Sequence, residues 1–113
     1  PRETVCFIGD GSYLYYPHSI YSACRLDLDL TVVVSDNRNY RILKNNTASL
    51  MGGEVDDYDY VGMDFEPPVD IPTNAESHGA RGHLVETPEE ISPVFADALD
   101  RSGTDVLDVL VHD

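Results

Sequence analysis

The fold is decided by the stretch TVCFIGDGS, residues 4–12, near the start of the 113-residue chain. Its first part, Thr4–Ile8, is a continuous and largely apolar run, which predicts a parallel strand buried on both faces. Gly9–Ser12 follow directly, and their glycines allow a sharp turn and a close approach of the backbone to a ligand. The stretch therefore predicts a buried strand that ends in a polar loop.

The rest of the chain alternates helical and extended patterns. We predict helices over 17–26, 40–44, 71–78 and from Thr87, and strands over 30–34, 83–85 and 106–111. Thr87 is the expected cap of the last helix, Glu90 its capping-box partner and Gly103 its end. The loop over 47–68 is long for a small domain, so it is functional or mobile. This order predicts one α/β domain over residues 1–113, a three-layer sandwich with a mostly parallel sheet and helices on both faces.

The charge balance argues against polyanionic partners. Asp and Glu number 21 against 7 Lys and Arg, a net charge of −14, so the clusters of basic residues that bind nucleic acid or anionic membranes are missing. The longest apolar run, residues 30–34, has only strand length, and no apolar signal segment precedes Thr4. We therefore expect a cytoplasmic protein, and the missing initiator Met indicates an excised or processed chain.

The acidic residues also suggest an environment. Asp outnumbers Glu 14 to 7, and both are scattered along the chain. We interpret this as a halophilic surface, on which carboxylates hold hydrated cations and salt screens their repulsion. An acidic protein interface or simple solubility is the alternative interpretation.

The remaining reactive side chains have plainer interpretations. We expect buried reduced thiols at Cys6 and Cys24. None of the four histidines has ligand spacing, and the acidic residues over 56–59 are expected to form a solvated loop. The three tyrosines over 13–16 could line a site or a subunit face, but core packing with wet hydroxyls is the preferred interpretation: Tyr13, Tyr15 and Tyr16.

Polar side chains follow the first two predicted strands. Gly9–Ser12 end the first strand, and Asp36–Asn39 follow the second. Ligands of parallel α/β sheets bind where the carboxyl ends of strands converge. Magnesium prefers six oxygen ligands, usually one or two carboxylates completed by phosphates and water. One Asp, one Asn side chain, one backbone carbonyl and two diphosphate oxygens would satisfy it.

These two segments resemble a known motif. Gly9–Ser12, the separation of 27 residues from Asp10 to Asn37, and residues 37–40 are similar to the thiamine diphosphate-binding motif of thiamine diphosphate-dependent enzymes. The similarity continues through residues 13–17, 40–44 and 67–71 to the C-terminus. It is closest to the acetolactate synthase and benzoylformate decarboxylase group and covers essentially the whole chain.

The resemblance implies roles for individual residues. It implies that Asp10 and Asn37 ligate Mg²⁺ through their side chains and Asn39 through its backbone carbonyl. It also implies that residues 9–12, with Asn37, Asn39 and Tyr40, bind thiamine diphosphate: Gly9, Asp10, Gly11, Ser12, Asn37, Asn39 and Tyr40. Asp36 departs from the family, which usually has asparagine there; its added charge could tighten the cation or weaken the diphosphate.

The resemblance also implies what this chain does not contain. In the family, a glutamate on a separate N-terminal domain, usually from a neighbouring subunit, activates the cofactor. We therefore expect no catalytic residue here and an inactive fragment of a 2-oxo acid decarboxylase or acetohydroxyacid synthase-like enzyme, a homodimer or homotetramer when intact. The alternative is a non-catalytic module that retains the fold and the site. A dinucleotide-binding fold fits poorly, because its third glycine would fall at Leu14.

Overall fold

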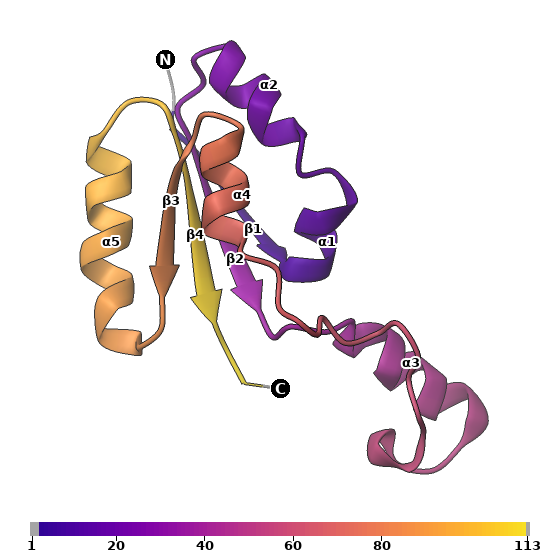
Figure 1. Cartoon of the computed structure of the whole chain (residues 1–113). Helices are drawn as coiled ribbons and strands as arrows, with labels where there is room; N and C mark the ends of the chain where they lie inside the picture. Colours follow the sequence, from indigo (N-terminus) through magenta and orange to yellow (C-terminus); the bar gives the residue numbers. More distant parts are fainter. Residues whose placement is uncertain (1–2, 113) are drawn as a thin grey trace.

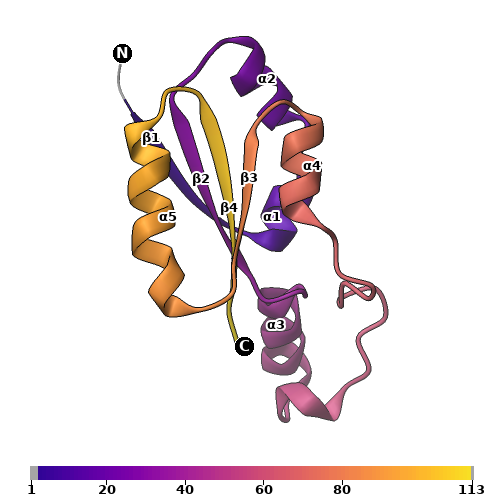
Figure 2. The same ribbon diagram turned by 60° about the vertical axis from the view of Figure 1, so that its left-hand side comes forward.

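The computed structural model describes residues 3–112 and contains four parallel strands in the order β1-β2-β4-β3 (Figure 1). The strands are β1 (Thr4–Gly9), β2 (Leu30–Asp36), β3 (Arg81–Val85) and β4 (Thr104–Leu110). Helices α1 (Asp10–Tyr15), α2 (Ser19–Arg25) and α4 (Ile71–Ser77) cover one face, and α5 (Pro88–Asp100) covers the other (Figure 2). The predicted three-layer α/β sandwich is confirmed. The ends of the predicted domain, residues 1, 2 and 113, lie outside the described residues.

The register of the sheet brings the carboxyl ends of three strands together. Gly9 of β1 pairs with Ser35 of β2, and Asp36 of β2 pairs with Leu110 of β4. The core beneath α1, α2 and α4 is apolar and nearly inaccessible to solvent, and it includes Val32, Val34, Ile71, Ala75 and Val106. Packing of these side chains fixes the strand ends, and with them the segments that follow β1 and β2.

The prediction that β1 is buried on both faces is wrong for this chain. Val5 is 48% exposed and Phe7 is 73% exposed. β1 lies at one edge of the sheet, whereas α5 packs on β3 and β4, toward the opposite edge. Apolar side chains of β1 therefore remain exposed, because the described residues do not cover them.

Two helices differ from the sequence prediction. α1 begins at Asp10, inside the segment predicted to be a loop, and the extended Gly9 is its cap (φ −81°, ψ 162°). Its six residues are too few to show a helical repeat. α3 (Arg41–Met51) extends beyond the predicted range, and it buries Ala48 in the added part. The predicted loop therefore begins at Gly52, where φ is +84°.

α3 and the loop that follows it project from the carboxyl edge of the sheet as an arm, residues 41–66 (Figure 1). The loop contains one short 3-10 turn, η1 (Val55–Asp57), with a capping box between Glu54 and Asp57. The arm accounts for the elongated shape of the molecule, 48 × 29 × 25 Å.

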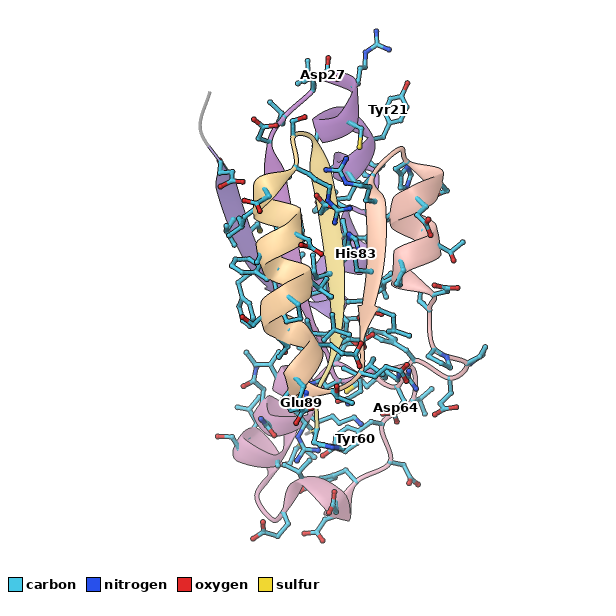
Figure 3. All side chains as sticks on the ribbon, turned by 90° about the vertical axis from the view of Figure 1, so that its left-hand side faces the viewer. Tyr21, Asp27, Tyr60, Asp64, His83 and Glu89 are labelled. Carbon is cyan, nitrogen blue, oxygen red and sulfur yellow. The ribbon has the colours of Figure 1, made fainter. Side chains whose placement is uncertain are left out.

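Two polar contacts hold the arm together. Lys44, the single lysine of the chain, donates to Asp64 at 2.5 Å and lies 5.4 Å from the centre of the Tyr60 ring. Figure 3 shows Tyr60 and Asp64 together on the loop beside α3. The acidic side chains over 56–59 are exposed, as predicted.

The ends of α5 also differ from expectation. Thr87 occupies the cap position, but its hydroxyl donates to the Glu90 carboxylate at 3.0 Å and accepts no hydrogen bond from a backbone N–H of the helix. The helix ends at Asp100, and Gly103 (φ +98°) forms the turn into β4. α5 has 13 residues, and no helix in residues 3–112 combines the length and apolarity needed to cross a bilayer.

The tyrosine and cysteine predictions are confirmed in part. Tyr13 is buried in the core, and its hydroxyl donates to Asn74 Oδ1 at 2.8 Å. Tyr15 and Tyr16 are 61% and 68% exposed, because the short α1 presents only Tyr13 to the sheet. Cys6 and Cys24 are free thiols, each half-buried.

Candidate functional site

A pocket of about 290 Å³ lies where the carboxyl ends of β1 and β2 meet the starts of α1 and α3. Its walls come from the end of β1, the first turn of α1, the segment after β2 and the first turn of α3. Each residue that the sequence predicted to bind the cofactor lines it: Gly9, Asp10, Gly11, Ser12, Asn37, Asn39 and Tyr40.

A single backbone amide connects the two segments predicted to bind the cofactor, Gly9–Ser12 and Asp36–Asn39. The N–H group of Arg38 donates to Asp10 Oδ2 at 2.7 Å and to Asp36 Oδ1 at 3.0 Å. Arg38 has a left-handed backbone (φ 60°), which is unfavourable for a residue with a side chain and common at functional sites. The strained turn is therefore held by a carboxylate from each of the two strand ends.

The turn after β2 presents oxygen atoms to the pocket. The Asn39 side-chain amide donates to the Asn37 carbonyl at 2.7 Å. Tyr40 N–H donates to Met63 O at 2.7 Å, and Phe65 N–H donates to Arg38 O at 2.8 Å. In an antiparallel bridge of this kind, the residue between the two bonds turns its own carbonyl away from the partner segment. The Asn39 carbonyl therefore points away from residues 63–65.

These donors fit a magnesium ion. Asp10 offers a carboxylate, Asn37 an amide oxygen and Asn39 a backbone carbonyl, and all three residues line the one pocket. Within residues 3–112, no three His, Cys, Asp or Glu side chains are arranged to hold a metal ion. A cation in this pocket would therefore depend on amide and carbonyl oxygens and on a phosphate, which suits Mg²⁺ and does not suit zinc.

Gly11 is required by close packing. A Cβ atom at this position would lie 2.6 Å from the Tyr40 ring, well inside van der Waals contact. The edge of Phe65 packs on the same ring at 4.8 Å between centroids, and Tyr15 stacks on it at 6.2 Å. Tyr40 thus packs the start of α3 against the first turn of α1.

Three carboxyl groups crowd behind this pocket. Asp10, Asp36 and Asp108 are 3%, 4% and 3% exposed. Burial, followed by the hydrogen bond and charge of Asp36, raises the pKa of Asp10 to about 6 and that of Asp108 to about 8. Burial and the Asp108 carboxylate raise the pKa of Tyr13 to about 12. A cation placed beside Asp10 would relieve part of this repulsion.

Sequence reasoning missed Asp108 and the depth at which Asp36 is buried. Asp36 does not line the pocket; it lies between Asp10 and Asp108, behind the wall. The signal for Asp108 was available, because an acidic residue interrupts the apolar run Val106–Leu110. Buried carboxyl groups are rare unless they are paired or functional.

The same chain was compared with known proteins. Residues 1–109 match the family model described as thiamine pyrophosphate enzyme, C-terminal TPP binding domain. The chain belongs to this family. The resemblance inferred from residues 9–12 and 37–40 is therefore confirmed, and thiamine diphosphate, also called thiamine pyrophosphate, is the cofactor of the family.

Individual relatives agree. The Rhodococcus jostii RHA1 thiamine diphosphate-dependent 4-hydroxybenzoylformate decarboxylase is 28% identical, with a TM-score of 0.86, and the match covers 98% of this chain and 20% of that one. Benzoylformate decarboxylase from Polynucleobacter necessarius is 31% identical, with a TM-score of 0.85 and the same coverage. 3D-(3,5/4)-trihydroxycyclohexane-1,2-dione hydrolase of Halalkalibacterium halodurans is 26% identical over 97% of this chain and 17% of its own length. This thiamine pyrophosphate-binding domain thus spans about a fifth of its relatives.

Proposed function

We propose that this domain anchors the diphosphate of thiamine diphosphate through one magnesium ion. Asp10 and Asn37 would bind the ion through their side chains, and Asn39 through its backbone carbonyl. Gly9, Gly11, Ser12 and Tyr40 would surround the diphosphate. The bound cofactor supplies an electron sink through its thiazolium ring, and the residues of this chain supply position and charge.

One observation carries the proposal: the Arg38 amide binds the carboxylate of Asp10 and so places Asn37 and Asn39 beside it. Residues far apart in the sequence thereby offer three hard oxygens to one pocket, and the close-packed Gly11 lets the backbone approach a ligand. The repulsion between Asp10 and Asp36 favours a cation here over an uncharged ligand.

Calorimetry tests the proposal. Thiamine diphosphate is titrated into the chain with and without Mg²⁺, and into the Asp10→Ala variant. We expect binding that requires Mg²⁺ and disappears in the variant. Asp97→Ala on the exposed face of α5 is the matched control and should bind as the original chain does. Equal affinity without the metal would refute the proposed ligation.

We further propose that the domain serves an enzyme acting on 2-oxo acids, with the cofactor held between two subunits of a homodimer or homotetramer. Two solved relatives named as benzoylformate or 4-hydroxybenzoylformate decarboxylases support this. The test is CO2 release from 2-oxo acids by the enzyme that carries this domain, together with its mass by sedimentation. Release that continues unchanged in Asp10→Ala would contradict the proposal.

We also propose that the surface is adapted to high salt. The net charge of −14 and the exposed acidic side chains on the arm and on α5 support this. Salt screens repulsion between exposed charges, so the melting temperature should rise steadily from dilute buffer to molar KCl. A melting temperature that is indifferent to salt would count against this adaptation.

A further inference from the structure

Asp108 is a buried acid for which the cofactor site alone gives no reason. It lies in the middle of β4, where it pairs with Val34, and it is 3% exposed. Its Oδ1 atom is inaccessible to solvent and has no hydrogen-bond partner among the described residues. Burying such a group without a hydrogen-bond partner is unfavourable, so its presence in an apolar strand calls for a compensating role.

The contacts of Asp108 lead to the turn after β2. It pairs with Val34, so its side chain lies on the same face of the sheet as that of Asp36, two residues further along β2, and both are buried. Asp36 in turn accepts the Arg38 N–H at 3.0 Å, and the same N–H donates to Asp10 at 2.7 Å. Asp108 thus stands at the inner end of a line of contacts that ends in the pocket.

Two carboxylates and a strained residue need such support. Asp36 and Asp10 repel each other when both are ionised, and the left-handed backbone of Arg38 (φ 60°) is unfavourable for a residue with a side chain. Without a partner behind it, Asp36 could rotate away from the Arg38 amide and release the turn. A carboxyl group at position 108 that keeps its proton can donate to Asp36 and prevent this rotation.

We infer that Asp108 is a positioning residue, which holds Asp36 and through it the turn Asp36–Asn39 against Asp10. Its effect on cation binding rests on the function proposed above, whereas its effect on the turn does not. Asp108 does not line the pocket, and among its neighbours Asp36 has the largest effect on its pKa.

The first measurement needs no cofactor. In ¹⁵N–¹H NMR spectra of the chain, the Arg38 amide should lie downfield because it donates to two carboxylates. Asp108→Leu, which has a similar volume and no donor, should move this signal upfield and speed its exchange with water by about tenfold or more. Asp108→Asn retains a donor and should change the exchange rate by less than about threefold.

The second measurement is the Mg²⁺ concentration that half-saturates thiamine diphosphate binding. Asp108→Leu should raise it by about tenfold, and Asp108→Asn by less than about threefold. In an Asp36→Asn background, the amide of residue 36 can itself donate to Asp10, so adding Asp108→Leu should cost less than about threefold. This lack of additivity separates positioning through Asp36 from a general effect on stability.

Asp105→Asn is the matched control, because Asp105 is also buried in β4 but lies on the α5 side of the sheet. It should leave the Arg38 amide and the Mg²⁺ requirement of the folded chain unchanged. If Asp108→Leu does not fold, Asp108→Ala takes its place.

An unchanged Arg38 amide in the folded variant, equal losses in Asp108→Leu and Asp108→Asn, or an equal loss in Asp105→Asn would overturn the inference. Absence of Mg²⁺-dependent binding in the original chain would refute the proposed function, and the amide measurement would still decide the positioning role.

Discussion

Two buried aspartates of β4 have opposite surroundings. Asp105, which is fully buried on the α5 side of the sheet, accepts two hydrogen bonds from Arg81 at 2.8 Å and lies 2.9 Å from His83 Nε2. Burial alone would raise the pKa of Asp105, but the bonds from Arg81 and His83 lower it below its ordinary value. Asp108, on the other face, has a pKa raised to about 8 by burial and by Asp36.

The surroundings of Asp105 and Asp108 indicate that one part of β4 stabilises the fold and another part lies beside the cofactor site. Arg81 also donates to the Ser102 carbonyl at 2.7 Å, so the paired cluster fastens the turn between α5 and β4 at the amino end of the sheet. Asp10, Asp36 and Asp108, which form no ion pair with a basic side chain among the described residues, gather toward the carboxyl end, where ligands of parallel sheets bind. Electrostatic conflict is confined to the end that receives the cofactor, as expected of a functional site.

The largest effect should come from breaking the paired cluster. Arg81→Ala leaves the fully buried Asp105 carboxylate without its main partner and should lower the free energy of unfolding by about 2–4 kcal/mol, because Arg81 is partly exposed and His83 remains beside Asp105. Urea denaturation near neutral pH measures this. Arg25→Ala, at the exposed end of α2, is the control and should change stability by less than about 0.5 kcal/mol. A loss below about 1 kcal/mol for Arg81→Ala would show that this cluster is not a structural anchor.

Two glycines allow a second comparison between a region that stabilises the fold and the cofactor pocket. A Cβ at Gly82 would lie 2.3 Å from the backbone oxygen of Pro72, so Gly82→Ala should force β3 and α4 apart and destabilise the fold by about 1–3 kcal/mol. A Cβ at Gly11 meets the movable Tyr40 ring, so Gly11→Ala should mainly weaken thiamine diphosphate binding. Thermal melting and calorimetry on both variants distinguish the effects. Equal losses of stability in the two variants would remove the distinction between the regions.

The sequence predicted the sandwich and the pocket because both depend on local signals. Gly9–Ser12 and Asp36–Asn39 end predicted strands, and parallel strands bring such ends together. The connection of Asp108 to Asp36 was not predictable, because it depends on β4 lying next to β2, which no local pattern specifies. The Arg81–Asp105 pair was missed for the same reason, since its partners come from neighbouring strands.

The two aspartates also differ in their effect on pH dependence. Because the pKa of Asp108 is raised in the folded state, the folded chain holds a proton that the unfolded chain releases, and the free energy of unfolding falls as pH rises from about 4 to about 8. Asp105 has the opposite sign: its lowered pKa contributes stability that is present above its ordinary pKa and is lost as pH falls below it.

Asp108→Asn should flatten the upper part of this profile. Its stability relative to the original chain should improve between about pH 5 and about pH 8, by no more than about 1.4 kcal/mol per pH unit. Asp105→Asn should show no such improvement and should lower stability throughout this range, because Arg81 loses its partner. Urea denaturation at several pH values measures both. Parallel profiles for Asp108→Asn and the original chain would contradict the raised pKa of Asp108.

The central claim is that the segments after β1 and β2 share one cation with the diphosphate. Mn²⁺, which replaces Mg²⁺ at such oxygen sites and broadens nearby NMR signals, tests it directly in the presence of thiamine diphosphate. We predict that substoichiometric Mn²⁺ broadens the amide signals of Gly11 and Asn39 together and leaves that of His83, at the α5 side of the sheet, sharp. Broadening of only one segment, or broadening that does not require thiamine diphosphate, would contradict the shared site.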